Sequence, residues 1–511
     1  MSDWNAQHSG VAAALAGLDM SMPGDIGFSG SGYGYWGGNL TAAVINGTVP
    51  QWRLDDMVVR IMSAYYKVGR DTARVPINFD SWTQNTTSYL HQFSQTDLTQ
   101  VNWHVNVQDD HWEVAREVAQ RSNVLLKNTN KALPLSKPWS MAVIGEDAHS
   151  NPAGPDACPD RNCDVGTLAM GWGSGTAQFP YLVAPVDALR AQAASDGTKF
   201  TNVSNNYDLA AAAAAAKGAS VAIVFGNADS GEAYIDIDDN AGDRKNLTLW
   251  GGADALIEAV AAVNPNTIVV LHTTGPVIVE AYKNNPNIKA IIWAGLPGQE
   301  SGNALVDVLY GKVNPTGKSV FTWGKDRTDW GTDILYSSPD ANPQIEFTEG
   351  VFIDYRRFDK YNIEPSYEFG FGLSYTTFEY SNLQITKMNP GPYQPTMGLT
   401  SAAPTFGTID KNPKDNEFPP GFPVITPYVY PYLTTQDPLT GDGIVPPGSQ
   451  DSSPQLRNPA GGSSGGNRQL YDVMYQVSVD IKNTGGVDGV EVAQLVSILP
   501  PISFRQSLIT I

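Results

Sequence analysis

Residues 111–330 alternate apolar, β-branched runs with helical stretches, and this alternation constrains the fold more than any other feature of the chain. A short apolar run bounded by turn residues is typical of a strand that is buried on both faces. Strands of that kind separated by helices form a mainly parallel sheet with helices on both sides. We expect strands at 141–145, 220–226, 267–272, 288–294 and 319–323, with helices between them that include the alanine-rich 208–217.

The first 70 residues carry a related pattern. Residues 5–17 place Ala and Leu at helical spacing, and 18–22 predict a short strand that ends at Pro23. Residues 51–67 predict an amphipathic helix directly after Pro50. Residues 1–70 therefore predict strand–helix units of an α/β structure, and the polar residues 71–110 predict a linker.

The C-terminal part of the chain has a different pattern. Residues 331–375 predict a second connector, and 376–511 predict short alternating strands without a long helix. Residues 475–482 alternate with period two and run into the turn sequence Asn-Thr-Gly-Gly, which favours a small β-sandwich. Residues 388–465 are rich in Pro, Gly and Ser, so we expect a surface insertion without a core of its own.

The charge balance is strongly acidic, with a net charge of −20 and an isoelectric point of about 4.6. Nucleic acids and anionic membranes bind through Lys and Arg, so neither is expected as a partner. The sequence also has no apolar run long enough to span a bilayer. The balance fits a secreted protein that works in acid, and it fits equally well a protein that simply needs to be soluble.

Cysteine usage and glycosylation sequons both indicate an oxidising compartment. The two cysteines, Cys158 and Cys163, lie in a polar loop without nearby histidines, which favours a small-loop disulfide over free thiols or a zinc site. The six histidines do not cluster, so we predict no metal and no cofactor. Five Asn-X-Ser/Thr sequons predict glycosylation at Asn39, Asn46, Asn85, Asn202 and Asn246.

Two acids stand in contexts that suit catalysis. Asp3 precedes Trp4, and Glu232 lies two residues before Tyr234, each in a segment suited to a loop that leaves a strand. Enzymes that cleave sugars need two carboxyl groups that flank one glycosidic bond. A single acid in a loop is usually only solvated, so the local context makes these two residues candidates.

Several ordered segments around these acids resemble glycoside hydrolase family 3, in particular the fungal secreted β-glucosidases, over about residues 1–495. The segments that carry the resemblance are 1–10, 13–25, 171–176, 227–234, 295–302, 349–356 and 367–375. The resemblance implies the remnant of a (β/α)8 barrel in 1–70, an α/β sandwich in 111–330 and an incomplete fibronectin type III-like β-sandwich in 376–511.

The resemblance also implies the roles of individual residues. Asp3 matches the nucleophile and Glu232 the acid/base of a retaining mechanism, which requires their carboxyl groups to lie roughly 5–5.5 Å apart. Three aromatic residues match positions that line the sugar subsites, and one serine matches a hydroxyl that contacts the bound glucose. These residues are Trp4, Phe28, Tyr234 and Ser174.

The chain departs from the family pattern at both ends. Most barrel strands and most groups that hold the glucose would lie upstream of Asp3, and the sequence diverges after residue 495. We therefore expect an upstream segment with a signal peptide, and negligible turnover by these 511 residues alone. The expected activity is a secreted β-glucosidase that acts on cellobiose, cello-oligosaccharides and β-glucosides. The alternatives are a β-xylosidase of the same family and a non-catalytic fragment that still binds sugar.

Overall fold

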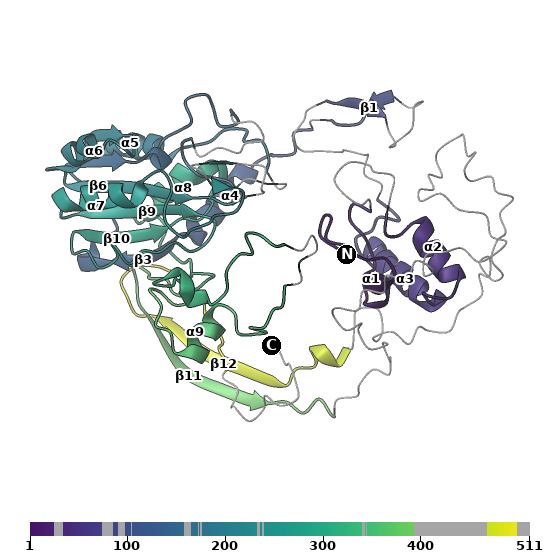
Figure 1. Ribbon diagram of the computed structural model, residues 1–511. Helices are drawn as coiled ribbons and strands as arrows, with labels where there is room; N and C mark the ends of the chain where they lie inside the picture. Colours follow the sequence, from purple (N-terminus) through teal and green to yellow (C-terminus); the bar gives the residue numbers. More distant parts are fainter. Residues whose placement is uncertain are drawn as a thin grey trace. The chain divides into compact units, whose positions relative to one another are not determined.

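The computed structural model describes residues 1–24, 34–73, 85–89, 98–103, 105–157, 165–171, 173, 176–231, 236–237, 240–339, 343, 345–392 and 468–497. The chain divides into two compact units (Figure 1). The first unit comprises Met1–Phe79, Asn85–Trp103 and Leu383–Ser478, and the second comprises Asp80–Gln84, His104–Asn382 and Val479–Ile511. Each unit is described by itself.

The first unit begins with two short parallel segments joined by a helix. The Ser2 N–H donates to the Met20 carbonyl over 2.9 Å, the Asn5 N–H donates to the Met22 carbonyl over 2.9 Å, and Trp4 forms a parallel bridge with Met22. Helix α1 (Val11–Leu15) lies between the two segments in the chain. This is a strand–helix–strand arrangement in miniature.

Two elements predicted for this region are shorter than expected. The helix predicted at 5–17 is only the five residues of α1, because Asn5 adopts a φ of 58° that an α-helix does not admit, and the helix begins only after Gly10. The strand predicted at 18–22 is reduced to the single bridge at Met22. The helix predicted at 51–67 is confirmed as α3 (Gln51–Lys67).

The buried Arg53 holds α3 to the start of the chain. Its guanidinium donates to the Ala14 carbonyl over 2.6 Å and to the Leu18 carbonyl over 2.9 Å, and it lies 2.8 Å from the Asp19 carboxylate. A buried cation is tolerated only when its donors find acceptors in this way. The unit also contains α2 (Gly38–Ile45) and the antiparallel strands β1 (Thr87–Tyr89) and β2 (Leu98–Gln100).

The second unit is built on a six-stranded sheet with the strand order β3-β10-β9-β6-β4-β5. The edge strand β3 is antiparallel to β10, and the other five strands are parallel. The strands are β3 (Val124–Asn128), β4 (Ser140–Ile144), β5 (Lys199–Val203), β6 (Val221–Ala228), β9 (Thr267–Thr273) and β10 (Ile288–Trp293). Four of the five predicted strands are therefore confirmed, as β4, β6, β9 and β10.

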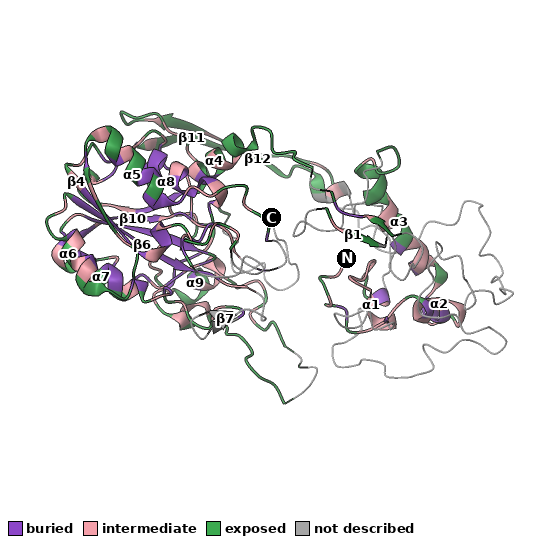
Figure 2. Cartoon of the chain, turned by 90° about the horizontal axis from the view of Figure 1, so that it is seen from above, coloured by how far each residue is buried: buried purple, intermediate pink, exposed green. Residues whose placement is uncertain are grey.

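Helices cover both faces of this sheet, and the central strands are buried between them (Figure 2). Along β6, Val221, Ile223 and Phe225 pack on one side with helices α5 (Pro185–Asp196) and α8 (Ser301–Leu309). Ala222 and Val224 pack on the other side with the remaining pair. That pair is α6 (Leu209–Ala216) and α7 (Ala253–Val263). Helix α6 confirms the helix predicted at 208–217. Because successive side chains of a strand alternate between faces, a strand covered on both sides must be apolar throughout.

The strand predicted at 319–323 was wrong. The Ser319 N–H donates to the Phe371 carbonyl over 2.8 Å and the Trp323 N–H to the Tyr367 carbonyl over 2.9 Å, but only the Trp323–Tyr367 pair forms a bridge. Trp323 is fully buried, with its ring centroid 6.3 Å from that of Trp293. The apolar run therefore reflects burial in an aromatic cluster, and β3 takes the edge position beside β10.

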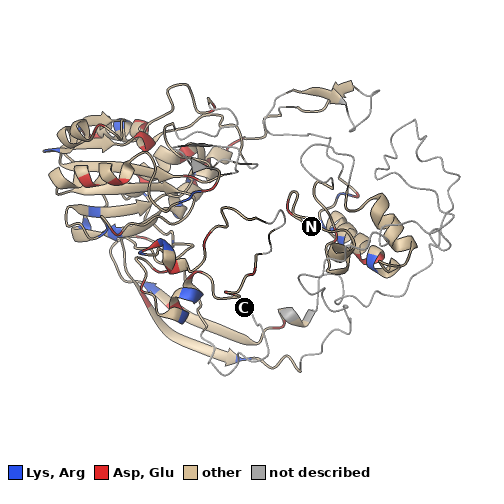
Figure 3. Cartoon of the chain, in the orientation of Figure 1, with Lys and Arg blue, Asp and Glu red and all other residues tan. Residues whose placement is uncertain are grey.

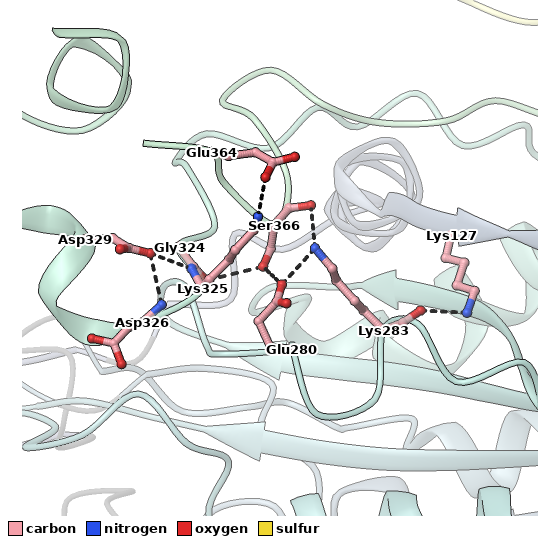
Figure 4. A network of polar contacts seen from close by, with 9 residues as sticks. All are labelled: Lys127, Glu280, Lys283, Gly324, Lys325, Asp326, Asp329, Glu364 and Ser366. Atoms are coloured by element: carbon pink, nitrogen blue, oxygen red, sulfur yellow. Dashed lines mark hydrogen bonds and ion pairs between the residues drawn. The ribbon is translucent and has the colours of Figure 1, made fainter. Parts of the chain in front are cut away.

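A polar network surrounds Glu280 and Lys283, which precede β10 in the chain (Figure 4). The Lys283 ammonium lies 2.7 Å from the Glu280 carboxylate and donates to the Ser366 carbonyl over 3.3 Å, and the Ser366 hydroxyl also donates to Glu280. Burial would raise the pKa of Glu280, but the hydrogen bonds from Lys283 and Ser366 outweigh it and leave the pKa lowered. Lys325 pairs with Glu364 over 2.7 Å. The contacts of Ser366 fasten it to the segment that precedes β10, and the Lys325–Glu364 pair links two parts of residues 324–366.

The remaining elements are peripheral. Strands β11 (Phe378–Lys387) and β12 (Tyr475–Asn483) form a two-stranded sheet, so the strand predicted at 475–482 is confirmed. The predicted insertion 388–465 lies outside the described residues beyond position 392. The other elements are α4 (His111–Ser122), α9 (Tyr355–Tyr361), β7 (Asp236–Ile237), β8 (Asn240–Ala241), and the 3-10 turns η1 (Thr129–Lys131), η2 (Glu146–Ala148), η4 (Gly298–Glu300), η5 (Arg327–Trp330) and η7 (Arg468–Tyr471).

Charged side chains lie mainly on helices and loops, and the central strands β6 and β9 carry no Lys, Arg, Asp or Glu (Figure 3). Among the helices that the structure describes, none is long and apolar enough to cross a membrane.

Candidate active site

The carboxyl ends of the parallel strands form the edge at which the candidate residues gather. In chain order the parallel strands are β4, β5, β6, β9 and β10, but in space they run β5-β4-β6-β9-β10. The direction of winding reverses between β4 and β6, and open α/β sheets bind ligands outside the carboxyl ends of their strands at such a reversal. The segment that leads to Glu232 leaves the sheet here, directly after β6.

A buried acid–histidine pair joins the loops at this edge. His272 Nδ1 lies 2.7 Å from Asp147 Oδ2, and the other oxygen, Oδ1, accepts the Leu168 N–H over 2.8 Å. Both side chains are almost completely buried, with exposed fractions of 0% for His272 and 2% for Asp147. His272 Nε2 has no hydrogen-bond partner among the described residues. The pair connects the ends of β4 and β9 to the segment that precedes Ser174.

The loop that carries Glu232 is closed at its base. The Ser230 hydroxyl donates to Asp243 Oδ1 over 2.8 Å and accepts the Arg244 N–H over 3.1 Å. The Arg244 side chain donates to the Pro276 carbonyl over 3.1 Å. Burial lowers the pKa of Arg244, and the nearby carboxylates of Asp229 and Asp243 oppose that shift. The two ends of the loop are thus tied to each other and to the segment that follows β9.

The segment that leads to Ser174 approaches the same edge. A Cβ atom on Gly171 would lie 3.4 Å from Asp229 Oδ1 and 3.4 Å from Leu296 Cδ1, so this position lies close to the residues that follow β6 and β10. The Gly298 N–H donates to the Ala169 carbonyl over 2.8 Å. The segments that lead to Ser174 and Glu232 therefore come together, although Ser174, Glu232 and Tyr234 themselves lie outside the described residues.

In the first unit, Asp3 and Trp4 are neighbours on an open surface. Both side chains are exposed, Trp4 by 55%, and Asp3 Oδ1 accepts the Trp4 N–H over 2.7 Å. They lie at the carboxyl end of the segment that pairs with Met20 and Met22, where the left-handed Asn5 turns the chain away. A sugar ring could reach both the exposed carboxylate and the exposed indole beside it. The Asp3–Glu232 separation stays a prediction, and Phe28 lies outside the described residues.

The predicted modification sites are described only in part. Cys158 and Cys163 lie outside the described residues, so the disulfide stays a prediction. Among the sequon asparagines, Asn85, Asn202 and Asn246 are exposed, and Asn39 and Asn46 are half-buried. Across the described ranges, no group of three or more His, Cys, Asp or Glu side chains could hold a metal ion. The predicted lack of a metal or cofactor is not tested by that finding.

Sequence reasoning missed several polar residues at this edge. Asp147, Arg244 and His272 are among them, and so is Glu300, which accepts the Tyr181 hydroxyl over 2.5 Å at an exposed fraction of only 2%. A usable signal was present, because Asp147 and His272 stand at the ends of apolar strands where the polarity changes. This change of polarity did not indicate which of these residues would contact each other.

Comparison with known proteins decides the family. The model of the glycosyl hydrolase family 3 C-terminal domain matches residues 123–375. Residues 123–375 therefore belong to glycoside hydrolase family 3. It is 53% identical over 511 residues to a probable β-glucosidase A of Aspergillus fumigatus, an alignment that covers 97% of this chain and 58% of the relative. It is also 53% identical over 510 residues to β-glucosidase A of Aspergillus kawachii, covering 97% of this chain and 59% of the relative.

Solved structures of this family are also similar to the chain. A family 3 β-glucosidase from Neurospora crassa matches with a TM-score of 0.78 and 54% identity, over 96% of this chain and 60% of the other. The β-glucosidase of Chaetomium thermophilum matches with a TM-score of 0.77 and 53% identity over the same shares. The chain thus spans less than two thirds of the length of the relatives it matches.

Proposed function

We propose that this family 3 chain forms part of a retaining β-glucosidase that releases terminal glucose from cellobiose, cello-oligosaccharides and β-glucosides. The observation that carries the proposal is the convergence of the segments that lead to Ser174 and Glu232 at the carboxyl edge of the sheet, where a Cβ atom on Gly171 would lie 3.4 Å from Asp229 Oδ1. The names of the relatives support the choice of substrate, since they are β-glucosidases.

In the proposed reaction, Asp3 attacks the anomeric carbon while Glu232 gives a proton to the departing oxygen. A glucosyl–Asp3 ester forms, and Glu232 then removes a proton from the water that hydrolyses it, so the configuration is retained overall. Trp4, Phe28 and Tyr234 would pack against the C–H faces of the sugar, and Ser174 would hydrogen-bond one of its hydroxyl groups. The exposure of Asp3 and Trp4 is consistent with direct access of a sugar to both.

Azide rescue tests the nucleophile role of Asp3 and the acid/base role of Glu232 separately. The protein used is the native gene product, whose ends are defined by mapping its transcript. In Asp3→Ala, azide can attack in place of the nucleophile and should give α-glucosyl azide from an activated aryl β-glucoside. In Glu232→Ala, azide can attack the glucosyl–Asp3 ester and should give β-glucosyl azide. Glu258→Gln, an exposed change on α7, is the control and should keep parental turnover. Parental turnover in both alanine variants, or the reverse stereochemistry, would refute the assignment.

Substrate preference separates the proposal from its closest rival. Side-by-side hydrolysis of an aryl β-glucoside and an aryl β-xyloside should favour the glucoside. A preference for the xyloside would replace the β-glucosidase with a β-xylosidase of the same family.

We also propose the parts of the architecture that the resemblance implies. Residues 1–70 would be the last units of a (β/α)8 barrel, and 376–511 an incomplete fibronectin type III-like sandwich around β11 and β12. Helix α3 exposes Val58, Val59 and Tyr66, which suits packing against further structure. A polypeptide of these 511 residues alone should therefore turn over aryl β-glucoside negligibly. Activity within about tenfold of the longer relatives would contradict this.

Secretion belongs to the same proposal. An oxidising route would allow the Cys158–Cys163 disulfide and glycans on the five sequons. Peptide mapping of the secreted gene product without reduction should recover Cys158 and Cys163 in one linked peptide. Two free thiols in the secreted protein would contradict the disulfide.

A further inference from the structure

A cavity of about 410 Å³ opens beside the carboxyl ends of β4 and β5, away from the residues that the proposed reaction uses. It is lined by Glu146, His149, Ser150, Pro152, Val165, Gly166, Ser204 and Asn205. A carboxylate, an imidazole, two hydroxyl groups and an amide therefore face one hollow. Such a lining offers hydrogen bonds to the hydroxyl and acetamido groups of a sugar.

The orientation of His149 follows from its contacts. His149 Nδ1 lies 2.8 Å from the Gly145 carbonyl, which can only accept, so Nδ1 carries the proton. In the neutral ring the other nitrogen, Nε2, is then an acceptor. It lies 3.0 Å from Asn202 Nδ2, so the Asn202 amide donates to it. One wall of the cavity thus holds the side-chain nitrogen of Asn202 in place.

Asn202 is the first residue of the sequon Asn202-Val203-Ser204, and it lies on the edge strand β5. Ser204, the last residue of the sequon, follows β5 directly and lines the cavity. Asn202 is exposed, as attachment of a glycan requires. A glycosylated Asn keeps one N–H, which could still donate to His149 while the sugar replaces the other hydrogen.

We propose that the cavity at the ends of β4 and β5 receives the first N-acetylglucosamine of a glycan attached to Asn202. The inference rests on the proposed secretion of the protein, because only that route adds the glycan. Bound there, the sugar would bridge the loop after β4 to the edge strand β5 and protect both from opening. The sequon at Asn246 differs from the one at Asn202. Asn246 Oδ1 accepts a hydrogen bond from the hydroxyl of Thr248, in the same sequon, over 3.0 Å, and neither residue lines this cavity.

The test uses the secreted, glycosylated gene product and three variants that each lose one sequon. Asn202→Gln and Ser204→Ala both prevent glycosylation at Asn202, by changing different side chains. Thr248→Ala prevents it at Asn246 and is the matched control. Glycopeptide mass spectrometry should show Asn202 occupied in the parent and empty in the first two variants.

Loss of the Asn202 glycan should lower Tm by about 2 °C or more and speed amide exchange in residues 145–150 and 199–205. Both Asn202-sequon variants should show this effect, while Thr248→Ala should leave the exchange of these segments unchanged. Trimming the parent with an endoglycosidase that leaves the first sugar should preserve its Tm. An unoccupied Asn202, or an occupied one whose loss changes neither Tm nor exchange, would overturn the proposal. Turnover of aryl β-glucoside is measured in parallel and should stay at the parental level, so a failure of the glycan proposal is distinct from a failure of the proposed activity.

Discussion

Removal of the Asp147 carboxylate should destabilise the second unit strongly. In Asp147→Ala, the Leu168 N–H and the His272 Nδ1–H both lose their acceptor in a site that water does not reach. Each unsatisfied buried donor costs about 1–3 kcal/mol, so the expected loss in the free energy of unfolding is about 2–6 kcal/mol. In Asp147→Asn, the amide oxygen can still accept from Leu168, and the amide N–H can donate to Nδ1 of the other histidine tautomer. We expect about 1–2 kcal/mol for that variant.

The assay is urea unfolding of the 511-residue chain, followed by tryptophan fluorescence, with the slope of the transition checked for constancy. Asp187→Ala is the matched control, because Asp187 is exposed and its ion pair with Arg190 over 2.7 Å is worth at most about 0.5 kcal/mol. The reasoning fails if Asp147→Ala costs no more than the control. It also fails if Asp147→Asn is as destabilising as Asp147→Ala.

Three further changes test other parts of the structure. Arg244→Gln removes the donor to the Pro276 carbonyl and should lower kcat/KM of the native gene product on aryl β-glucoside by about tenfold or more, whereas the exposed Arg190→Gln should not. Burial raises the pKa of Asp254 from 3.8 to about 6, so the folded state binds this proton more tightly than the unfolded state. The free energy of unfolding should therefore fall by about 2 kcal/mol between pH 4 and pH 7, and Asp254→Asn should flatten that decline in urea titrations at both pH values. Trp323→Ala empties a fully buried site and should cost about 3–5 kcal/mol in the same assay, while a loss below about 1 kcal/mol would contradict its place in the core.

The sheet could be predicted from the sequence because burial on both faces leaves a local signature. Strands β6 and β9 are buried at every position, and each is a continuous run of mainly apolar residues. The same signature failed at 319–323, where buried aromatic residues pack beside the sheet without joining it. It also failed to predict β3, whose antiparallel place at the edge depends on pairing with β10, 160 residues later in the chain.

The residues of the candidate site could be predicted only through the family resemblance. The buried Asp147–His272 pair at the same edge of the sheet was not predicted. Asp147 and His272 are 125 positions apart, and they meet because β6 lies between β4 and β9 in the sheet. The register places Ile144 opposite Val224 and His272 opposite Asn227, so the two strand ends reach the same edge. Sequence patterns give the strands but neither their order nor their register, and the contact follows from both.

The contacts of Ser230 have a consequence for the proposed acid/base. Glu232 follows Ser230 by two residues, and two residues span at most about 7 Å. Because Asp243 and Arg244 hold Ser230 at the base of the loop, we expect changes at this base to act on Glu232 more directly than changes at the β7–β8 pair farther along. Substitutions in this pair should therefore affect substrate preference more than proton transfer, whereas substitutions at the base should affect both. The pH profile of kcat/KM separates these outcomes, since only a displaced acid/base alters its limb on the alkaline side.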